Sequence, residues 1–228
     1  MLNSIDKDIK AQGYVLRRTN YGEADRILSL ITPYGKISAI AKGVRKEKSK
    51  LAGGIEVFSL SDFVIHRGKT DFGVITSARM LKYHGEIVKD LKKMEMAAMF
   101  LKRIDRLSND SDSSDYFRIL NQSLNYINMG DELSLVEAWF LLNSVKATGE
   151  DVNLYRDVEG KKLEAGKRYR WDDGELSFIE KNDGEYGANE IKLLRMMLTN
   201  DLGVVKRVKT DEEMRSTILR VAKVLACV

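Results

Sequence analysis

The 228-residue sequence contains only one cysteine, one proline and two histidines. The single cysteine, Cys227, permits neither an internal disulfide nor a cysteine-based zinc site, and it fits a reducing compartment. His66 and His84 stand apart, and the sequence has no HExxH, CxxC or GxSxG motif. We therefore predict that the chain is not an enzyme and has no catalytic residues, no metal ligands and no cofactor.

Two short segments resemble parts of nucleotide-binding enzymes. Gly68-Lys69-Thr70 is similar to the end of a phosphate-binding loop, but Phe63 stands where that motif needs a glycine, and a strand rather than a helix is expected to follow. Asp71-Phe72-Gly73 matches a kinase triplet without the His-Arg-Asp sequence that accompanies it. Both segments are therefore interpreted as parts of a turn between strands.

Long apolar runs are also missing. No segment approaches the roughly 20 apolar residues that cross a bilayer. The amino-terminal segment, MLNSIDKDIKAQ, is charged and lacks the apolar stretch of a secretory signal. These features predict a soluble cytoplasmic protein with no membrane partner.

The charges that are present are distributed unevenly. The net charge is +4. Residues 1–82 hold 15 Lys+Arg and 8 Asp+Glu, a net +7, whereas residues 83–228 hold 23 and 26, a net −3. This asymmetry indicates that the amino-terminal part binds a polyanion. The alternative is that its surface is basic by chance and binds no polyanion.

The pattern of residues 1–82 is typical of strands. Thr32-Pro33-Tyr34-Gly35 is a strong turn signal between two of them. Glycines and charges in residues 43–55 predict a mobile connection rather than a helix. Five strands in about 80 residues is the size of an OB-type barrel. The expected strands are 13–18, 25–32, 36–42, 56–67 and 72–79, with a turn at Gly68–Asp71.

After Lys82 the apolar spacing becomes helical. Helices are expected at 86–107, 116–127, 133–147, 188–199 and 211–225. Residues 154–181 return to strands, with an Asp-Gly turn at Asp172–Glu175. The predicted fold is α+β: a five-stranded OB-type barrel (1–82) followed by a mainly α-helical domain (83–228) with a small β-hairpin insertion (154–181).

The stretch from Lys36 to Lys50 contains six cations and one anion. Cations at this density displace the counterions of a nucleic acid, and exposed aromatic rings stack on bases. Phe58 is assigned to the core in preference to stacking, and a solvated loop remains the alternative for the lysines. The DNA-binding candidates are Arg17, Arg18, Tyr21, Arg26, Tyr34, Lys36, Lys42, Arg45, Lys46, Lys48 and Lys50.

An ordered set of short fragments resembles the RecO recombination-mediator family over roughly residues 13–82. Each fragment is weak alone, but their order and spacing agree with the family. Phe58-Ser59 and His66–Lys69 extend the match. The principal fragments are Tyr21–Arg26, Leu30–Thr32, Gly35–Ile37, Ala41–Arg45 and Lys48–Gly53.

The resemblance implies an amino-terminal OB-fold and a carboxyl-terminal helical domain without enzymatic activity. It also implies binding of single- and double-stranded DNA, annealing of complementary strands, and association with the nucleoid. The implied protein partners are RecR and the single-strand binding protein, which together assist the loading of RecA. The acidic tail of the single-strand binding protein would then meet a basic-rimmed groove of the helical domain, with Arg195, Lys206, Arg207 and Arg215 as candidates.

The sequence departs from this family at one place. Many members carry a four-cysteine zinc site in the second domain, but residues 154–185 contain no cysteine. We expect an apolar cluster of Tyr155, Tyr169, Trp171 and Phe178 in its place. An alternative function is a protein-interaction adaptor whose basic loop contacts an acidic protein partner.

Overall fold

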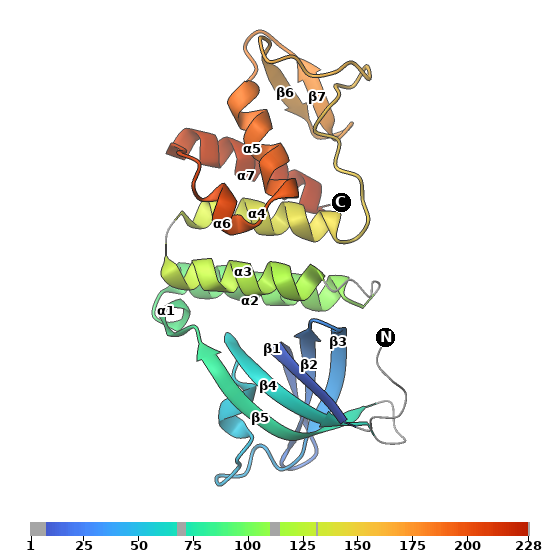
Figure 1. The fold of residues 1–228 in the computed structure, drawn as a ribbon, viewed down its shortest axis with the longest axis vertical. Helices are drawn as coiled ribbons and strands as arrows, with labels where there is room; N and C mark the ends of the chain where they lie inside the picture. Colours follow the sequence, from blue (N-terminus) through green and yellow to red (C-terminus); the bar gives the residue numbers. More distant parts are fainter. Residues whose placement is uncertain (1–7, 68–71, 110–114, 131, 228) are drawn as a thin grey trace. The chain divides into compact units, whose positions relative to one another are not determined.

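The structure is a computed structural model that describes residues 8–67, 72–109, 115–130 and 132–227. The chain forms two compact units, residues 1–130 and 131–228 (Figure 1). The first unit therefore includes residues 83–130, which were expected to belong to the helical domain. The expected turn at Gly68–Asp71 lies outside the described residues. None of the helices in the described ranges is long and apolar enough to span a membrane.

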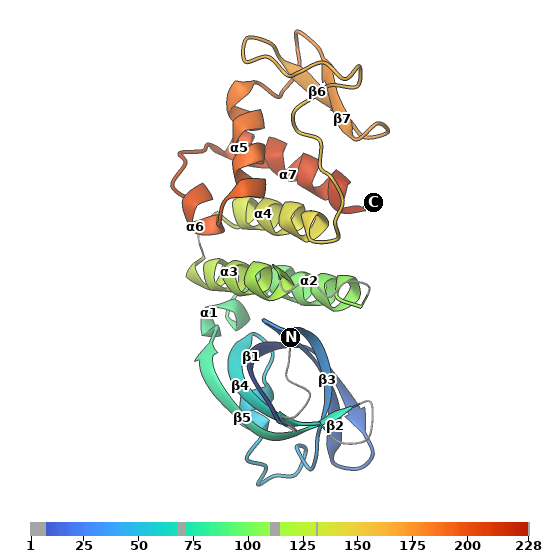
Figure 2. The ribbon, with the colours of Figure 1, turned by 45° about the vertical axis from the view of Figure 1, so that its right-hand side comes forward.

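Five strands of the first unit close into a barrel in the order β1-β2-β3-β5-β4 (Figure 2). β1 is long enough to pair with two neighbours: its first half is antiparallel to β4 and its second half to β2. A short parallel pairing between β3 and β5 closes the ring. This arrangement confirms the predicted OB-type barrel. The strands are β1 (Asp8–Tyr21), β2 (Asp25–Thr32), β3 (Gly35–Ala41), β4 (Ser59–His66) and β5 (Gly73–Tyr83).

Alternating side chains fill the barrel. Along β4 every second residue is buried, which is the pattern of a strand with one face on a core. Phe63 and Ile65 of β4 meet Leu28 and Leu30 of β2 inside the barrel. Each such side chain contributes about 1.5–3 kcal/mol when fully buried. Phe58 is also buried, which confirms its assignment to the core.

Several segments differ from the sequence-based expectations. β1 continues to Tyr21, beyond the predicted end at Arg18, because Thr19–Tyr21 pair with β2. The helix expected over 86–107 is two helices, α1 (Gly85–Val88) and α2 (Leu91–Leu107). The break occurs because the Asp90 carboxylate accepts a hydrogen bond from the Lys93 amide, at 3.0 Å, and so caps α2.

Helix α2 lies beside α3 (Asp115–Met129), and the Asp105 carboxylate of α2 binds three strands of the barrel. Asp105 accepts from Arg17 Nε of β1 at 3.0 Å and from Ser29 Oγ of β2 at 2.6 Å. Lys36 Nζ of β3 lies 2.6 Å from Oδ1, the oxygen that also accepts from Ser29, whereas Arg17 binds Oδ2. One partly buried carboxylate thus joins β1, β2 and β3 to the helical layer.

A second polar contact joins the barrel to α3. Tyr14 Oη donates to Asn121 Oδ1 at 2.8 Å. The buried His84 ring lies between the Phe58 carbonyl, 2.8 Å from Nδ1, and Asn125 Oδ1, 3.2 Å from Nε2. Burial lowers the pKa of His84, although both hydrogen bonds oppose this effect. The first unit is therefore held together by polar groups as well as by its core.

The second unit is built around α4 (Leu133–Lys146), which packs against α5 (Ala188–Thr199) and α7 (Glu212–Cys227). Trp139 Nε1 donates to the Asn200 carbonyl at 3.0 Å, and Asn143 Nδ2 donates to the Met197 carbonyl at 2.9 Å. Both polar side chains are satisfied within the core, as buried polar groups require. The remaining elements are β6 (Tyr169–Asp172), β7 (Ser177–Glu180) and α6 (Leu202–Val205). Neither α6 nor the short 3-10 helix η1 (Ala52–Ile55) was expected from the sequence.

The Asp105 contacts predict acid sensitivity. Burial raises the pKa of this carboxyl, but the hydrogen bonds from Lys36 and Ser29 outweigh burial and hold the pKa below its ordinary value of 3.8. A depressed pKa in the folded state adds stability at pH values above the ordinary pKa, and this stability is lost as the pH falls through the folded-state pKa. Asp105→Asn should lower the free energy of unfolding at pH 7 by about 2 kcal/mol, since it removes charge-assisted hydrogen bonds.

Urea denaturation of wild type and Asp105→Asn between pH 7 and pH 3 measures both effects. The difference in unfolding free energy between the two proteins should narrow below pH 4. Asp151→Asn is the matched control, because Asp151 is exposed in the segment that follows α4. Equal stability of wild type and Asp105→Asn at pH 7 would contradict the role assigned to Asp105.

Candidate nucleic-acid interface

The connection between β3 and β4 carries the densest positive charge, and its residues 42–50 are called the basic loop. Its start is fixed to the barrel: the Gly43 amide donates to Asp25 Oδ1 at 2.6 Å, and the Arg45 amide donates to the Ala24 carbonyl at 2.9 Å. The Val44 side chain is buried in the barrel core. The loop was expected to be mobile, but these contacts hold its first residues against the turn between β1 and β2.

The end of the basic loop is also fixed. The Ser49 amide donates to the Lys46 carbonyl at 3.0 Å, and η1 follows. A Cβ on Gly54 of η1 would lie 2.2 Å from the Ala78 carbonyl oxygen, so only glycine permits this close approach to β5. The loop is therefore a short projection held at both ends rather than a free linker.

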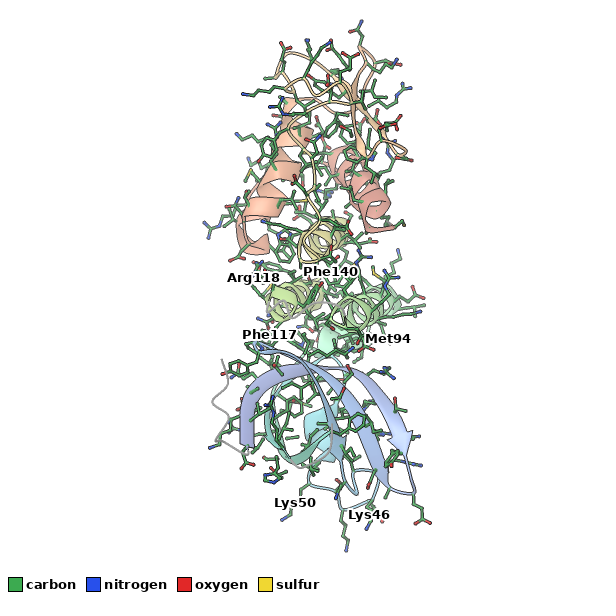
Figure 3. The ribbon with its side chains drawn as sticks, turned by 90° about the vertical axis from the view of Figure 1, so that its right-hand side faces the viewer. Lys46, Lys50, Met94, Phe117, Arg118 and Phe140 are labelled. Carbon is green, nitrogen blue, oxygen red and sulfur yellow. The ribbon has the colours of Figure 1, made fainter. Side chains whose placement is uncertain are left out.

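Five cations of the basic loop face solvent. Lys46 and Lys50 project from the end of the barrel that is distant from α2 and α3 (Figure 3). Their exposure leaves the ammonium groups accessible to phosphates, which bind by charge and require no fixed geometry. The exposed cations are Lys42, Arg45, Lys46, Lys48 and Lys50.

The turn between β1 and β2 lies next to the basic loop. Arg45 Nη1 approaches the Gly22 carbonyl at 3.5 Å. Tyr21 at the end of β1 is 54% exposed, so its ring is available for stacking. Arg26 is half-buried and donates from Nε to Asn20 Oδ1 at 3.2 Å. This end of the barrel thus combines a cluster of cations with one exposed aromatic ring.

The other DNA-binding candidates lie elsewhere on the barrel. In the β2–β3 pair, Gly35 faces Thr32 and Ala41 faces Arg26. Six residues at about 3.3 Å each place these two ends of β3 roughly 20 Å apart. Lys36 and Tyr34 therefore lie at the end of the barrel opposite the basic loop.

Lys36 is engaged within the protein. Its side chain is 14% exposed, and Nζ donates to the Asp105 carbonyl and to Asn109 Oδ1, each at 2.6 Å, besides its ion pair with the Asp105 carboxylate. Arg17 shares that carboxylate but remains largely exposed. Arg18 donates to Glu56 Oε2 at 3.1 Å. The contacts of Lys36 with Asp105 and Asn109 leave its ammonium group poorly placed to neutralise a phosphate.

A shallow cleft of about 630 Å³ adjoins Tyr34 on the outside of the barrel. Lys10 of β1 and Arg79 of β5 line it, and neither was a candidate in the sequence analysis. Both occupy outward-facing positions of strands that are distant in sequence. Only the pairing of β1, β4 and β5 brings them together.

The partner-binding candidates of the second unit do not form one cluster. Arg195 Nε donates to the Leu154 carbonyl at 2.9 Å, and its guanidinium lies 4.5 Å from the centre of the Tyr155 ring. Arg215 Nη1 lies 3.4 Å from Glu132 Oε1, and Lys206 Nζ lies 3.9 Å from Oε2 of the same residue. These three cations therefore bind groups of their own unit. The fourth candidate, Arg207, is exposed.

An aromatic cluster occupies the segment where related proteins were expected to bind zinc. The Trp171 and Phe178 rings meet edge to face with centroids 5.0 Å apart, and Phe178 also contacts Tyr169 and Tyr186. Tyr155 was expected in this cluster, but it is 56% exposed and packs on Arg195 instead. Tyr186 occupies the place that was assigned to Tyr155. In the described residues no group of three or more His, Cys, Asp or Glu side chains is arranged to hold a metal ion.

The aromatic cluster predicts stability without metal. Phe178→Ala should lower the free energy of unfolding by about 3–5 kcal/mol, because the ring is fully buried. Tyr155→Ala, the exposed control, should cost much less. Metal analysis of the purified protein should find no stoichiometric zinc, and EDTA should leave the Tm unchanged. A zinc content near one per chain would overturn this account of the segment.

Models of known protein families match both parts of the chain. The family model described as Recombination protein O N terminal matches residues 7–84, and the model described as Recombination protein O C terminal matches residues 88–224. These matches confirm the resemblance found in the sequence and agree with the OB-like barrel.

Curated proteins named DNA repair protein RecO are similar to the chain. The protein from Alkaliphilus metalliredigens is 28% identical over 225 residues, covering 94% of this chain and 91% of that protein. The protein from Dehalococcoides mccartyi strain 195 is 28% identical over 219 residues, covering 92% and 86%. The protein from Rubrobacter xylanophilus is 34% identical over 142 residues, covering 61% and 57%.

Proposed function

The chain belongs to the RecO family of DNA repair and recombination proteins, and we propose that it binds single- and double-stranded DNA and anneals complementary strands. The observation that supports this most directly is the exposed cluster of cations on the basic loop. The neighbouring Tyr21 adds an exposed ring to the same end of the barrel. We propose residues 1–82 as the DNA-binding domain and residues 83–228 as the partner-binding domain.

The proposed mechanism is electrostatic capture. Two DNA strands repel each other through their phosphates, so complementary bases meet rarely at low salt. The cations of the basic loop neutralise phosphates of either strand and release counterions. Because these cations contact the backbone and read no bases, the capture has no sequence preference. Lys36 is omitted from this surface, since its ammonium group binds Asp105 and Asn109.

The proposed protein partners follow from the family. We propose that RecR and the acidic tail of the single-strand binding protein bind this chain, and that the complex assists RecA loading on the nucleoid. Arg207 is the candidate cation for the acidic tail, because it is exposed whereas Arg195, Lys206 and Arg215 bind groups within their own unit. The proposed role requires no catalytic residue.

Changing Lys46, Lys48 and Lys50 together to Ala should weaken binding to every DNA sequence. For single strands each lost phosphate contact reduces the magnitude of the slope of log K against log[salt] by about 0.7. The slope of the triple variant should therefore be smaller in magnitude by about 2 than that of the wild type. Fluorescence anisotropy at several salt concentrations measures this slope. The same variant should anneal complementary strands more slowly at low salt.

The matched control removes the same charge from the second unit. Lys162, Lys181 and Lys192 are exposed, and changing them to Ala should leave the slope and the annealing rate near wild type. If the basic-loop variant kept the wild-type slope, the basic loop would not be the DNA surface. Weak DNA binding by the wild type at low salt would instead favour the adaptor function, in which the basic loop contacts an acidic protein.

A further inference from the structure

The cleft beside Tyr34 lies on a different face of the first unit from the basic loop. Strands β1, β4 and β5 form its floor, and the turn between β2 and β3 forms one wall. Tyr34 is 60% exposed on this turn, beside Pro33. A flat ring exposed at the edge of a cleft is a surface on which a planar ligand can stack.

The turn holds the Tyr34 backbone in a defined place. Thr32 is fully buried, and its Oγ1 accepts from the Tyr34 amide at 3.1 Å and donates to the Gly35 carbonyl at 2.9 Å. Gly35 has φ of +99°, a conformation that glycine adopts without strain. The ring is thus presented by a turn whose backbone is fixed on both sides, so little backbone entropy is lost when a ligand stacks on it.

The groups that line the cleft suit a nucleotide. Lys10 is an exposed cation for a phosphate. Arg79 Nη2 binds Asp62 Oδ2 at 3.0 Å, and the pair places a donor and an acceptor on the floor. Gln12 and Ser77 add further donors and acceptors for the edge of a base.

We propose that this cleft binds one unpaired nucleotide of a single strand, with its base stacked on Tyr34 and its phosphate near Lys10. A paired base is unavailable to the cleft because both of its faces are stacked within the duplex. The cleft therefore distinguishes single from double strands, whereas the basic loop binds both. This inference rests on the proposed DNA binding and adds a second subsite to it.

The two subsites set a minimum length for the DNA. Tyr34 and the start of the basic loop are separated by roughly 20 Å along β3, or about six nucleotides at the 3.4 Å spacing of a stacked strand. A strand must exceed this length to occupy both. Strands of about twelve nucleotides satisfy this requirement and lie within the site sizes of single OB-folds.

The test compares two ligands and two tyrosine variants. The ligands are a dT oligonucleotide of about twelve residues and the same sugar-phosphate chain without bases. Tyr34→Ala should weaken binding of the dT strand by about tenfold, the range for loss of one stacked base, and should leave the abasic strand within about twofold. Tyr34→Phe keeps the ring and should match the wild type. Tyr83→Ala removes an exposed tyrosine of β5 that does not line the cleft, and it should also match.

The outcomes separate the two proposals. If the wild type bound neither strand, the proposed DNA binding itself would fail. If it bound both strands but Tyr34→Ala weakened both equally or neither, the basic loop could still bind DNA, and the nucleotide cleft would be rejected. An effect of Tyr34→Phe as large as that of Tyr34→Ala would also reject stacking, because the ring is retained.

Discussion

The Asp105 carboxylate is the interaction on which the first unit depends. It receives Arg17 from β1, Ser29 from β2 and Lys36 from β3, and it belongs to α2. Three strands and a helical layer therefore meet at one anion. Breaking such a partly buried group leaves unpaired charges behind, which costs more than the loss of an exposed ion pair. The position of the barrel against α2 and α3 follows from this contact and from the Tyr14 and His84 contacts with α3.

The same interaction divides the cations of the barrel into two sets. Lys36 serves the fold because its ammonium group is surrounded by Asp105 and Asn109. The cations of the basic loop face solvent at the opposite end of the barrel. The loop itself is held by Asp25 and by the buried Val44 side chain. Its charges are thus presented on a fixed support, so the proposed capture of a DNA backbone requires no folding of the loop.

The sequence predicted the barrel well because its strands carry local signals. β2 and α5 have their predicted bounds, and the Pro33-Tyr34-Gly35 turn connects β2 to β3 as expected. Contacts between distant residues were not predictable. The pairing of Lys36 with Asp105 joins residues that are far apart in sequence, so a run of cations gave no indication that its first member is structural. The cluster contains Tyr186 where Tyr155 was expected, and this error has the same cause. Both residues are aromatic, so the sequence alone does not show which of them packs in the cluster.

The cleft beside Tyr34 was missed for a related reason. Lys10, Asp62 and Arg79 are ordinary outward-facing residues of their strands, and only strand pairing gathers them beside Tyr34. Under the proposed function, the basic loop and the cleft give one small barrel two kinds of DNA contact. The first reads charge alone and the second requires an accessible base.

The central claim is that structural and DNA-binding cations are separate, and Lys36→Met tests it most directly. The free energy of unfolding and the salt slope of DNA binding are measured on the same variant. The account predicts a loss of about 1.5–3 kcal/mol in stability, the range for a charge-assisted hydrogen bond, with the wild-type salt slope retained. Wild-type stability combined with a slope reduced by about 0.7 would show that Lys36 contacts a phosphate, and would contradict the account.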